Sequence, residues 1–348
     1  MKRIGYIYEK ICTIENIKLA IVKSSAGKRD RHFVLKVTNN IERYAKEIQK
    51  MLLEKSYIPS PYRRKMIKDG SSQKEREISK PRYYPDQIIH WALMLQLHKI
   101  FLKGMYTYTC GGVPKKGTSY AQKALRKWID KDKKNTKYCL KMDISKYYSS
   151  IDKEILKEKI KKIIKDKNCL WLIDTIIDSC KNGLPIGNYT SQWFSNYFLQ
   201  NLDYFIKCDL GACYYIRYVD DMIIMGSNKK KLHIMRKQID IYLNNINLKL
   251  KSNWQVFPLS KRDIDFLGVR FYKEKTTLRG RNSLRIRRRM KKINSKKLLN
   301  YIDACAIVSY WGWIKRTDSY LFYNSFKNDL VNIRNAKNVI SEFTRNNK

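Results

Sequence analysis

The chain has 348 residues, with 73 Lys and Arg against 31 Asp and Glu, so its formal net charge is +42, while 43% of its residues are hydrophobic. This length can bury one large core or the cores of two or three subdomains, and the excess positive charge favours a polyanionic partner such as nucleic acid. No apolar run approaches the roughly 20 residues of a membrane span and the N-terminus does not resemble a signal peptide, so we expect a cytoplasmic protein with no membrane partner. The eight cysteines are scattered and histidines number four, which argues against a zinc site or a disulfide framework.

Several segments have a pattern typical of one kind of secondary structure. Residues 40–57 and 153–167 space Ile and Leu at helical intervals opposite Lys and Glu, which predicts two amphipathic helices. Four prolines in residues 59–85 predict strands and loops instead. From 137 to 272 strand-like and helical runs alternate, as in an α+β domain built on a sheet. Residues 279–297 then contain ten Lys and Arg and no acid, and precede an aromatic end that we expect to be helical.

Two adjacent acids, Asp220 and Asp221, lie between apolar, β-prone runs in YYIRYVDDMIIMG, residues 214–226. The pattern predicts a hairpin whose two-residue turn is Asp220-Asp221, and a solvated turn is the simplest alternative. Apolar flanks argue against that alternative, because neighbouring carboxylates in a partly desolvated site repel unless a cation neutralises them. Carboxylates without a nearby histidine or thiol favour Mg²⁺, which usually takes one or two protein carboxylates plus substrate phosphates.

A third acid, Asp143, ends the strand-like run YCLKM and opens a polar stretch. Its alternative role is to cap the N-terminus of the segment that follows. Together with Asp220 and Asp221 it fits a two-metal site, in which ions roughly 3.5–4 Å apart clamp the attacking and leaving oxygens of a phosphoryl displacement.

These motifs resemble those of a known family. YVDD at 218–221, DISKYYSSID from Asp143, and GLPIGNYTSQWFSNYFLQNLD at 183–203 occur in the order and approximate spacing of the palm motifs of reverse transcriptases. The likeness extends to residues 74–93 and 265–272 and covers about residues 60–330. It implies an α+β right-hand polymerase with fingers, a palm with an antiparallel sheet and helices, and a short helical thumb. The implied domains are an N-terminal extension with fingers (1–136), a palm (137–275, with 183–200 between fingers and palm) and a basic thumb (276–348).

The resemblance also implies site residues, cofactors and partners. Catalysis and metal binding are implied for Asp143, Asp220 and Asp221, with the backbone carbonyl of Ile144 as a further metal ligand; nucleotide binding for Lys74, Arg76, Tyr148, Pro185, Ile186, Gly187 and Gln192; and nucleic-acid binding for Arg285, Arg287, Arg288 and Arg289. The cofactor is two Mg²⁺ ions, with Mn²⁺ as a substitute. The partners are an RNA template, which can be a structured noncoding RNA, a primer or cDNA strand, dNTPs and an accessory protein.

Some implied roles have simpler alternatives. Tyr148 occupies the family's position for an aromatic ring against C2′ of the incoming sugar, but it can also be a core residue, with Tyr147 pointing the opposite way on a strand. Lys74 and Arg76 match residues that grip the triphosphate, although basic residues are common throughout. The run 279–297 can equally be a flexible basic tail. Near Trp254 the family often has a lysine that protonates pyrophosphate, and Lys249 or Lys251 could serve here.

One departure from the common family pattern points to a subgroup. Ile186 stands where group II intron and retron enzymes usually carry Gln, and the motif LPIGN-x-TSQ resembles that of diversity-generating retroelements, in which this change is linked to errors opposite template adenine. An antiphage defence reverse transcriptase acting with a structured noncoding RNA is the main alternative. An inactive RNA-binding scaffold is disfavoured by the three acids, and an RNA-dependent RNA polymerase by Tyr148.

Overall fold

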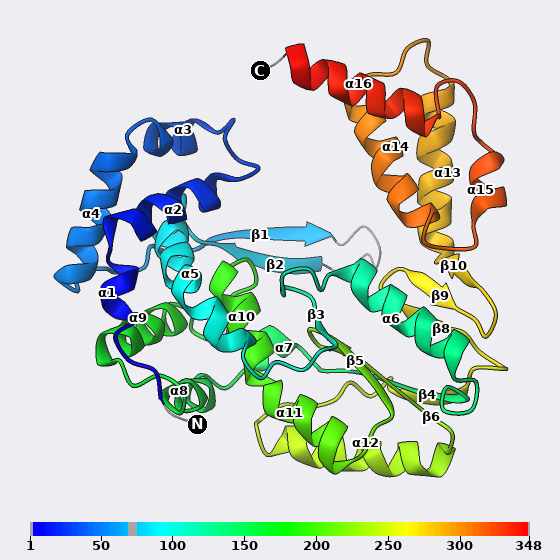
Figure 1. Ribbon diagram of the computed structural model, residues 1–348, viewed down its shortest axis with the longest axis horizontal. Helices are drawn as coiled ribbons and strands as arrows, with labels where there is room; N and C mark the ends of the chain where they lie inside the picture. Colours follow the sequence, from blue (N-terminus) through cyan, green and yellow to red (C-terminus); the bar gives the residue numbers. More distant parts are fainter. Residues whose placement is uncertain (1–2, 69–74, 347–348) are drawn as a thin grey trace.

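The computed structural model describes residues 3–68 and 75–346, and shows a helical N-terminal part, a central sheet and a helical C-terminal part (Figure 1). The predicted helix in 40–57 is confirmed, because the apolar residues that bury one face of α4 recur at helical spacing. Within the segment 59–85, residues 63–68 and 75–80 are extended, also as predicted, and pair as antiparallel strands. The elements of the N-terminal part are α1 (Tyr8–Ile11), α2 (Ile14–Ser25), α3 (His32–Thr38), α4 (Ile41–Leu53), β1 (Arg63–Lys68), β2 (Glu75–Lys80), a short wide helical turn (Tyr83–Gln87) and α5 (Ile88–Leu102).

The central sheet has five strands in the order β3-β5-β6-β4-β7, and all its pairs are antiparallel except β3 with β5. Side chains alternate between its faces, since Met142 and Ile224 belong to one apolar core while Ile223 and Met225 belong to another. The sheet therefore separates two cores. A strand end that lies at the edge of the sheet can carry polar residues. Its strands are β3 (Thr109–Cys110), β4 (Tyr138–Asp143), β5 (Tyr214–Tyr218), β6 (Asp221–Gly226) and β7 (Gln255–Pro258).

The helices between residues 147 and 244 contribute to the first core. The helix predicted over 153–167 is shorter than expected, because α8 ends at Lys161 and a new helix starts at Lys167. The Asp166 carboxylate caps that new helix by accepting the N–H groups of Asn168 and Cys169, both at 3.1 Å. The helices are α7 (Tyr147–Ser150), α8 (Lys153–Lys161), α9 (Lys167–Asp178), α10 (Tyr189–Phe198), α11 (Gln200–Tyr204), a short wide turn (Phe205–Asp209) and α12 (Lys229–Asn244).

The second core joins α6 to a small antiparallel sheet and to the C-terminal helices. The basic run 279–297 is mostly one helix, α13, whose buried stripe includes Ile286, Met290 and Ile293, so the flexible-tail alternative is wrong. The aromatic end is helical as predicted, and the α+β class is confirmed. Within the described ranges, no helix has both the length and the apolar character needed to cross a membrane. The elements are α6 (Thr118–Lys131), β8 (Ile264–Phe266), β9 (Val269–Phe271), β10 (Thr276–Leu278), α13 (Gly280–Asn294), α14 (Tyr301–Ile314), α15 (Tyr320–Asn324) and α16 (Ile333–Asn346).

Candidate active site

The acid pair lies at the tip of the β5–β6 hairpin. Tyr218 pairs directly with Asp221, so the two-residue turn consists of Val219 and Asp220, and the predicted Asp220-Asp221 turn is wrong by one residue. Val219 has a φ of 58°, which a β-branched residue rarely adopts. Its N–H donates to the carbonyl of Cys110 at 3.1 Å. Contacts with a neighbouring segment, rather than local turn preference, therefore decide where the chain reverses.

Asp143 lies next to this tip. It ends β4 as the cross-strand partner of Asp221, and the N–H of Ile144 donates to the carbonyl of Asp220 at 3.3 Å. The alternative role of Asp143 as a helix cap is wrong, because the N-cap of α7 is Lys146. Three acids that are far apart in sequence are thus neighbours at one edge of the central sheet.

A lysine accompanies the acids. The N–H of Lys251 donates to the carbonyl of Asp143 at 2.8 Å, and its Nζ lies 2.5 Å from Asp143 Oδ2. Both side chains are about one third exposed, at 31% and 32%. Lys249 contributes its backbone carbonyl, which accepts the N–H of Ser145 at 2.8 Å. Of the two lysines considered from the sequence, Lys251 is therefore the one whose ammonium group the fold places on a candidate catalytic acid.

The electrostatics of the acids reflect burial and crowding. Burial, followed by the charge of Asp143, raises the pKa of Asp220 to about 6. Burial also raises the pKa of Asp221 to about 7, although Lys141 opposes it. Asp143 Oδ1 and Asp221 Oδ1 are buried and accept no hydrogen bond from any described residue. Such carboxylates favour either a proton or a cation between them.

A hard divalent cation fits this donor set. In the part of the chain that the structure describes, three or more His, Cys, Asp or Glu side chains nowhere form a ready-made ligand cage, and Asp143 is instead paired with Lys251. The two unsatisfied carboxylate oxygens and the absence of nitrogen or sulfur ligands among these three acids nevertheless suit Mg²⁺, which needs only a few protein oxygens.

A buried ion pair between Arg217 and Asp203 supports the tip of the β5–β6 hairpin, which carries Asp220 and Asp221. Arg217 on β5 and Asp203 on α11 are fully buried, and Arg217 Nε and Nη2 bond the two oxygens of Asp203 at 2.7 and 2.6 Å. Asp203 also accepts the hydroxyl groups of Thr109 at 2.8 Å and Tyr215 at 2.7 Å. The carboxylate is therefore compensated by a bidentate partner and two further donors, as a buried charge requires.

The same guanidinium reaches the turn itself. Arg217 Nη1 donates to the carbonyl of Val219 at 2.9 Å and to Asn196 Oδ1 at 3.2 Å, while Asn196 Nδ2 donates to the carbonyl of Gly111 at 2.7 Å. Gly111 lies so close that a Cβ there would come within 2.8 Å of Val219 Cγ2. The sequence-based prediction missed Asp203, Asn196 and Gly111. The signal for these partners in the sequence is Arg217 itself, because a charged residue inside an apolar strand needs a buried partner.

Tyr148 lies close to the acids but not on a strand. Tyr147 and Tyr148 are both in the one-turn helix α7, so the expected strand alternation is wrong. Both still contact α10, because the Tyr147 hydroxyl donates to the carbonyl of Ser195 at 2.5 Å and Ser195 Oγ donates to the Tyr148 hydroxyl at 3.4 Å. Tyr147 is buried whereas Tyr148 is half-buried, and burial raises the pKa of Tyr148, with a smaller contribution from Asp220.

The segment GLPIG, residues 183–187, packs between α7 and the β1–β2 hairpin. A Cβ on Gly183, whose φ is 53°, would lie 2.2 Å from the carbonyl oxygen of Tyr148, so this position requires glycine. At the other end, the N–H of Ser79 donates to the carbonyl of Ile186 at 2.8 Å, and a Cβ on Gly187 would lie 2.6 Å from Ser79 O. The segment thus touches both the helix of Tyr148 and the strand β2.

The predicted nucleotide-binding residues are partly gathered around this segment. Pro185 is buried in it, Ile186 is 37% exposed, and Gln192 is exposed on α10. Arg76 is exposed on β2, the strand that bonds Ile186. Lys74 lies outside the described residues.

The four arginines predicted to bind nucleic acid lie along α13. Arg289 Nη2 is 2.5 Å from Asp303 Oδ1, a carboxylate that is 1% exposed and that Lys296 also contacts. Arg285 and Arg287 lie over the rings of Tyr310 and Phe322, at 5.9 and 5.6 Å, and Arg288 is exposed. Arg289 therefore has an internal structural role, and the predicted role of these arginines stays a prediction.

Comparison with known proteins gives one family match and several likenesses of structure. A model of the family described as "Reverse transcriptase (RNA-dependent DNA polymerase)" matches residues 68–271, more than half of the chain. Similar solved structures include a telomerase from Candida albicans in complex with a TWJ fragment of telomeric RNA (11% identity, TM-score 0.48, covering 89% of this chain and 66% of that chain). Another is apo telomerase from Candida tropicalis (14% identity, TM-score 0.49, covering 89% and 60%). The chain thus spans less than two thirds of the length of either telomerase chain.

Proposed function

The chain belongs to the reverse transcriptase (RNA-dependent DNA polymerase) family, and we propose that it extends a DNA primer with dNTPs along an RNA template. Its polymerase fold of mixed α and β elements is consistent with this activity. The observation that carries the proposal is the meeting of Asp143, Asp220 and Asp221 at one edge of the central sheet. On this proposal residues 1–136 contain the fingers, 137–275 form the palm and 276–348 form the thumb.

The three acids and the carbonyl of Ile144 hold divalent ions, preferably Mg²⁺, with Mn²⁺ as a substitute. When bound, such ions lower the pKa of the primer 3′-hydroxyl and neutralise charge on the phosphates. The chain itself supplies no nucleophile, so its task is to orient the primer end and the nucleotide. Support for this assignment comes from the unsatisfied oxygens of Asp143 and Asp221, which need a cationic partner.

Tyr148 selects the sugar, and the GLPIG segment faces the nascent base pair. Tyr148 is half-buried and close to Asp220, so its ring can exclude a 2′-hydroxyl beside the acids. Pro185, Ile186, Gly187 and Gln192 contact the new base pair, and Arg76 with Lys74 binds the triphosphate, since cationic forks suit phosphate oxygens. The hydrogen bond between Ser79 and Ile186 supports this division of roles, because it joins the strand of Arg76 to the base-pair segment.

The enzyme is of the diversity-generating retroelement type. The support is Ile186, which is 37% exposed and presents an apolar side chain where related enzymes present a polar one. Its partners are then an RNA that encodes a protein segment and an accessory protein. An antiphage reverse transcriptase acting with a structured noncoding RNA remains the second candidate, because the same acids serve both.

The polymerase proposal is tested with an acid double variant. Asp220→Asn with Asp221→Asn removes both carboxylates of the hairpin tip but keeps their shape, so we expect Mg²⁺-dependent dNTP incorporation on a primed RNA to be lost while RNA binding persists. Asp209→Asn, which changes an exposed acid, is the control and should keep full incorporation. Full activity of the double variant would contradict the metal assignment.

The retroelement proposal is tested by sequencing the RNA and cDNA that copurify with the chain. Substitutions concentrated at template adenines in copies of a protein-coding RNA are expected. Accurate or repetitive copies of a structured noncoding RNA would contradict the retroelement assignment and favour the defence candidate. Replacing Ile186 by Gln should lower the frequency of adenine-directed errors.

A further inference from the structure

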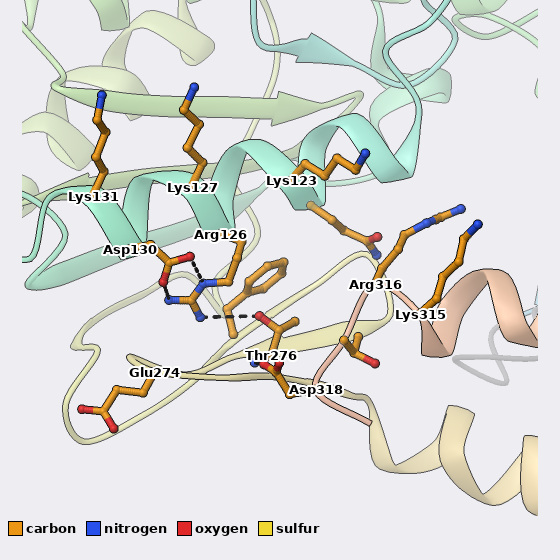
Figure 2. Close-up of a pocket in the computed structure, with 13 residues that line it drawn as sticks. Lys123, Arg126, Lys127, Asp130, Lys131, Glu274, Thr276, Lys315, Arg316 and Asp318 are labelled. Atoms are coloured by element: carbon orange, nitrogen blue, oxygen red, sulfur yellow. Dashed lines mark hydrogen bonds and ion pairs between the residues drawn. The ribbon is translucent and has the colours of Figure 1, made fainter. Parts of the chain in front are cut away.

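A basic cleft lies between α6, the β9–β10 loop and the residues that follow α14 (Figure 2). It has a volume of about 860 Å³. Six of its lining residues are basic and three are acidic. The basic residues are Lys123, Arg126, Lys127, Lys131, Lys315 and Arg316. The cleft therefore carries an excess of positive charge that the three catalytic candidates do not explain, since none of them lines it.

One of these basic side chains, Arg126, is already bonded to other residues of the protein. Arg126 forms an ion pair with Asp130 at 2.6 Å and donates to the carbonyls of Tyr272 and Lys273 at 2.9 and 3.0 Å. Arg126 and Asp130 point toward the β9–β10 loop, as Figure 2 shows. This guanidinium fixes one wall of the cleft and neutralises one of the three acids.

Two hydrogen bonds between Asp318 and Thr276 fix the opposite wall. The N–H of Asp318 donates to the carbonyl of Thr276 at 2.7 Å, and Asp318 Oδ2 accepts the N–H of Thr276 at 2.7 Å. The segment that carries Lys315 and Arg316 is therefore tied to β10. The cleft is held in shape by both walls before any ligand enters.

The five remaining basic side chains of the cleft do not hold its walls in place in this way. Lys123, Lys127 and Lys131 are exposed and follow one another at four-residue intervals along α6, which places them about 6 Å apart along the helix axis. In Figure 2 Lys127 and Lys131 extend from the side of α6 opposite to Arg126 and Asp130, and Lys123 lies at the end of α6 nearest to Lys315 and Arg316. Lys315 and Arg316 are exposed at the other wall. No ion pair to any of the five occurs within residues 3–68 and 75–346.

We propose that this cleft binds the backbone of a single nucleic-acid strand, with the three lysines of α6 along one side and Lys315 and Arg316 along the other. The proposal rests on the proposed function, and it names a contact outside the catalytic acids. A row of like charges one helical turn apart matches a polyanion whose charges repeat along a chain, and binding relieves their mutual repulsion.

The size and lining of the cleft decide between one strand and a duplex. Pockets of about 300–1,000 Å³ enclose small ligands, so the volume fits a few nucleotides of one strand. Phe271 is the one aromatic residue among the described residues that line the cleft, which leaves little surface for stacking bases. The contact is therefore to phosphates and independent of sequence.

The test compares two triple variants of the full chain that lose the same charge. Lys123→Gln, Lys127→Gln and Lys131→Gln remove the α6 row. The matched control replaces Lys229, Lys230 and Lys237, exposed residues of α12, which packs into the other core. Binding of a short unstructured RNA is measured by fluorescence anisotropy over a range of KCl concentrations, without dNTPs.

We expect the α6 variant to bind roughly tenfold more weakly at low salt, with a log–log salt slope shallower by about 2, because each lost phosphate contact contributes about 0.7. The α12 variant should keep the slope of the unmodified chain. Lys315→Gln with Arg316→Gln should shift the slope in the same direction as the α6 variant. Equal slopes for the α6 and α12 variants would overturn the proposal.

Two further arms identify the strand. A single DNA strand of the same length and an RNA duplex replace the RNA. If the α6 variant binds the single-stranded RNA more weakly than the unmodified chain does but binds the DNA strand equally well, the cleft is assigned to the template. If only binding of the DNA strand is weaker, the cleft is assigned to the product. If the α6 variant loses as much affinity for the RNA duplex as for the single strand, the single-strand assignment is overturned. A failure of the proposed function is recognised separately, because it appears as absent dNTP incorporation by the unmodified chain, whereas binding is scored without dNTPs.

Discussion

At the scale of single residues, the geometry of the acid tip depends on side chains that do not take part in chemistry. Arg217 is fully buried and is bonded to the buried residues Asp203 and Asn196 and to the carbonyl of Val219. The meeting of the three acids could be expected from the sequence, because Asp220 and Asp221 lie between apolar runs and Asp143 ends another strand-like run. The partner of Arg217 could not, because Asp203 belongs to a different element and only packing brings the two together.

Replacing Arg217 by Met should destabilise the fold by about 3–5 kcal/mol, because Asp203 would remain buried without its compensating charge. Chemical denaturation followed by circular dichroism measures the change in the free energy of unfolding. Arg43→Met, which removes an exposed Arg partner of Glu47 on α4, is the control and should unfold like the unmodified chain. A loss below about 1 kcal/mol for the Arg217 variant would contradict the role of the buried pair.

Tyr148 gives a second prediction at this scale. Tyr148→Val removes the ring beside the acids, so ribonucleotide incorporation should rise roughly 10–200-fold relative to dNTP incorporation, the range expected when about 1–3 kcal/mol of steric discrimination is lost. Single-nucleotide primer extension with rNTPs and dNTPs measures the ratio. Tyr148→Phe keeps the ring and loses only the bond to Ser195, so it should remain selective. Unchanged selectivity of the Val variant would place the sugar filter elsewhere.

At the scale of elements, sequence patterns located helices and strands better than their ends. β4, β5 and β6 follow from apolar runs, but the hairpin turn lies one residue early because Cys110 and Arg217 hold Val219 at a positive φ. The helix predicted to reach residue 167 ends at Lys161 for a similar reason. Asp166 binds the start of α9 and also accepts the N–H groups of Ile7 and Tyr8 at 2.7 and 2.8 Å.

Asp166→Asn should therefore destabilise the fold by about 1–2 kcal/mol at neutral pH, since one carboxylate serves two helix starts. Burial raises the pKa of Asp166, but its backbone hydrogen bonds outweigh burial and hold the pKa below its usual range. A carboxyl group with a lowered folded-state pKa stabilises the fold above its unfolded pKa, about 3.9, and loses that contribution as pH falls through the folded value. Denaturation at neutral pH and below pH 4 should show the gap to the unmodified chain narrowing in acid; a constant gap would contradict the role of the charge.

At the scale of the whole molecule, the net charge of +42 is the dominant property. Composition alone predicted a polyanionic partner, but it could not place the cleft between α6 and residues 315–318, because that cleft arises from how distant elements pack. Self-repulsion of so many like charges opposes compaction, and a bound polyanion relieves it.

A noncognate RNA should accordingly raise the Tm of the chain by a few degrees at low ionic strength, because it binds the folded, charge-dense state more tightly than the unfolded chain. The increase should fall steadily as KCl is added. Differential scanning fluorimetry measures both effects, and dextran, an uncharged polymer, is the control. An increase that persists in high salt would show that contacts other than charge dominate.

The two anchor points of Arg217 have one more consequence. Asn196 belongs to the helix that follows the GLPIG segment, and Val219 belongs to the turn with the acids, so a single guanidinium joins the segment proposed to contact the base pair to the turn proposed to bind metal ions. On the proposed function, the accuracy and the rate of nucleotide addition are then mechanically linked. A substitution that changes the accuracy of the enzyme should therefore also change its rate.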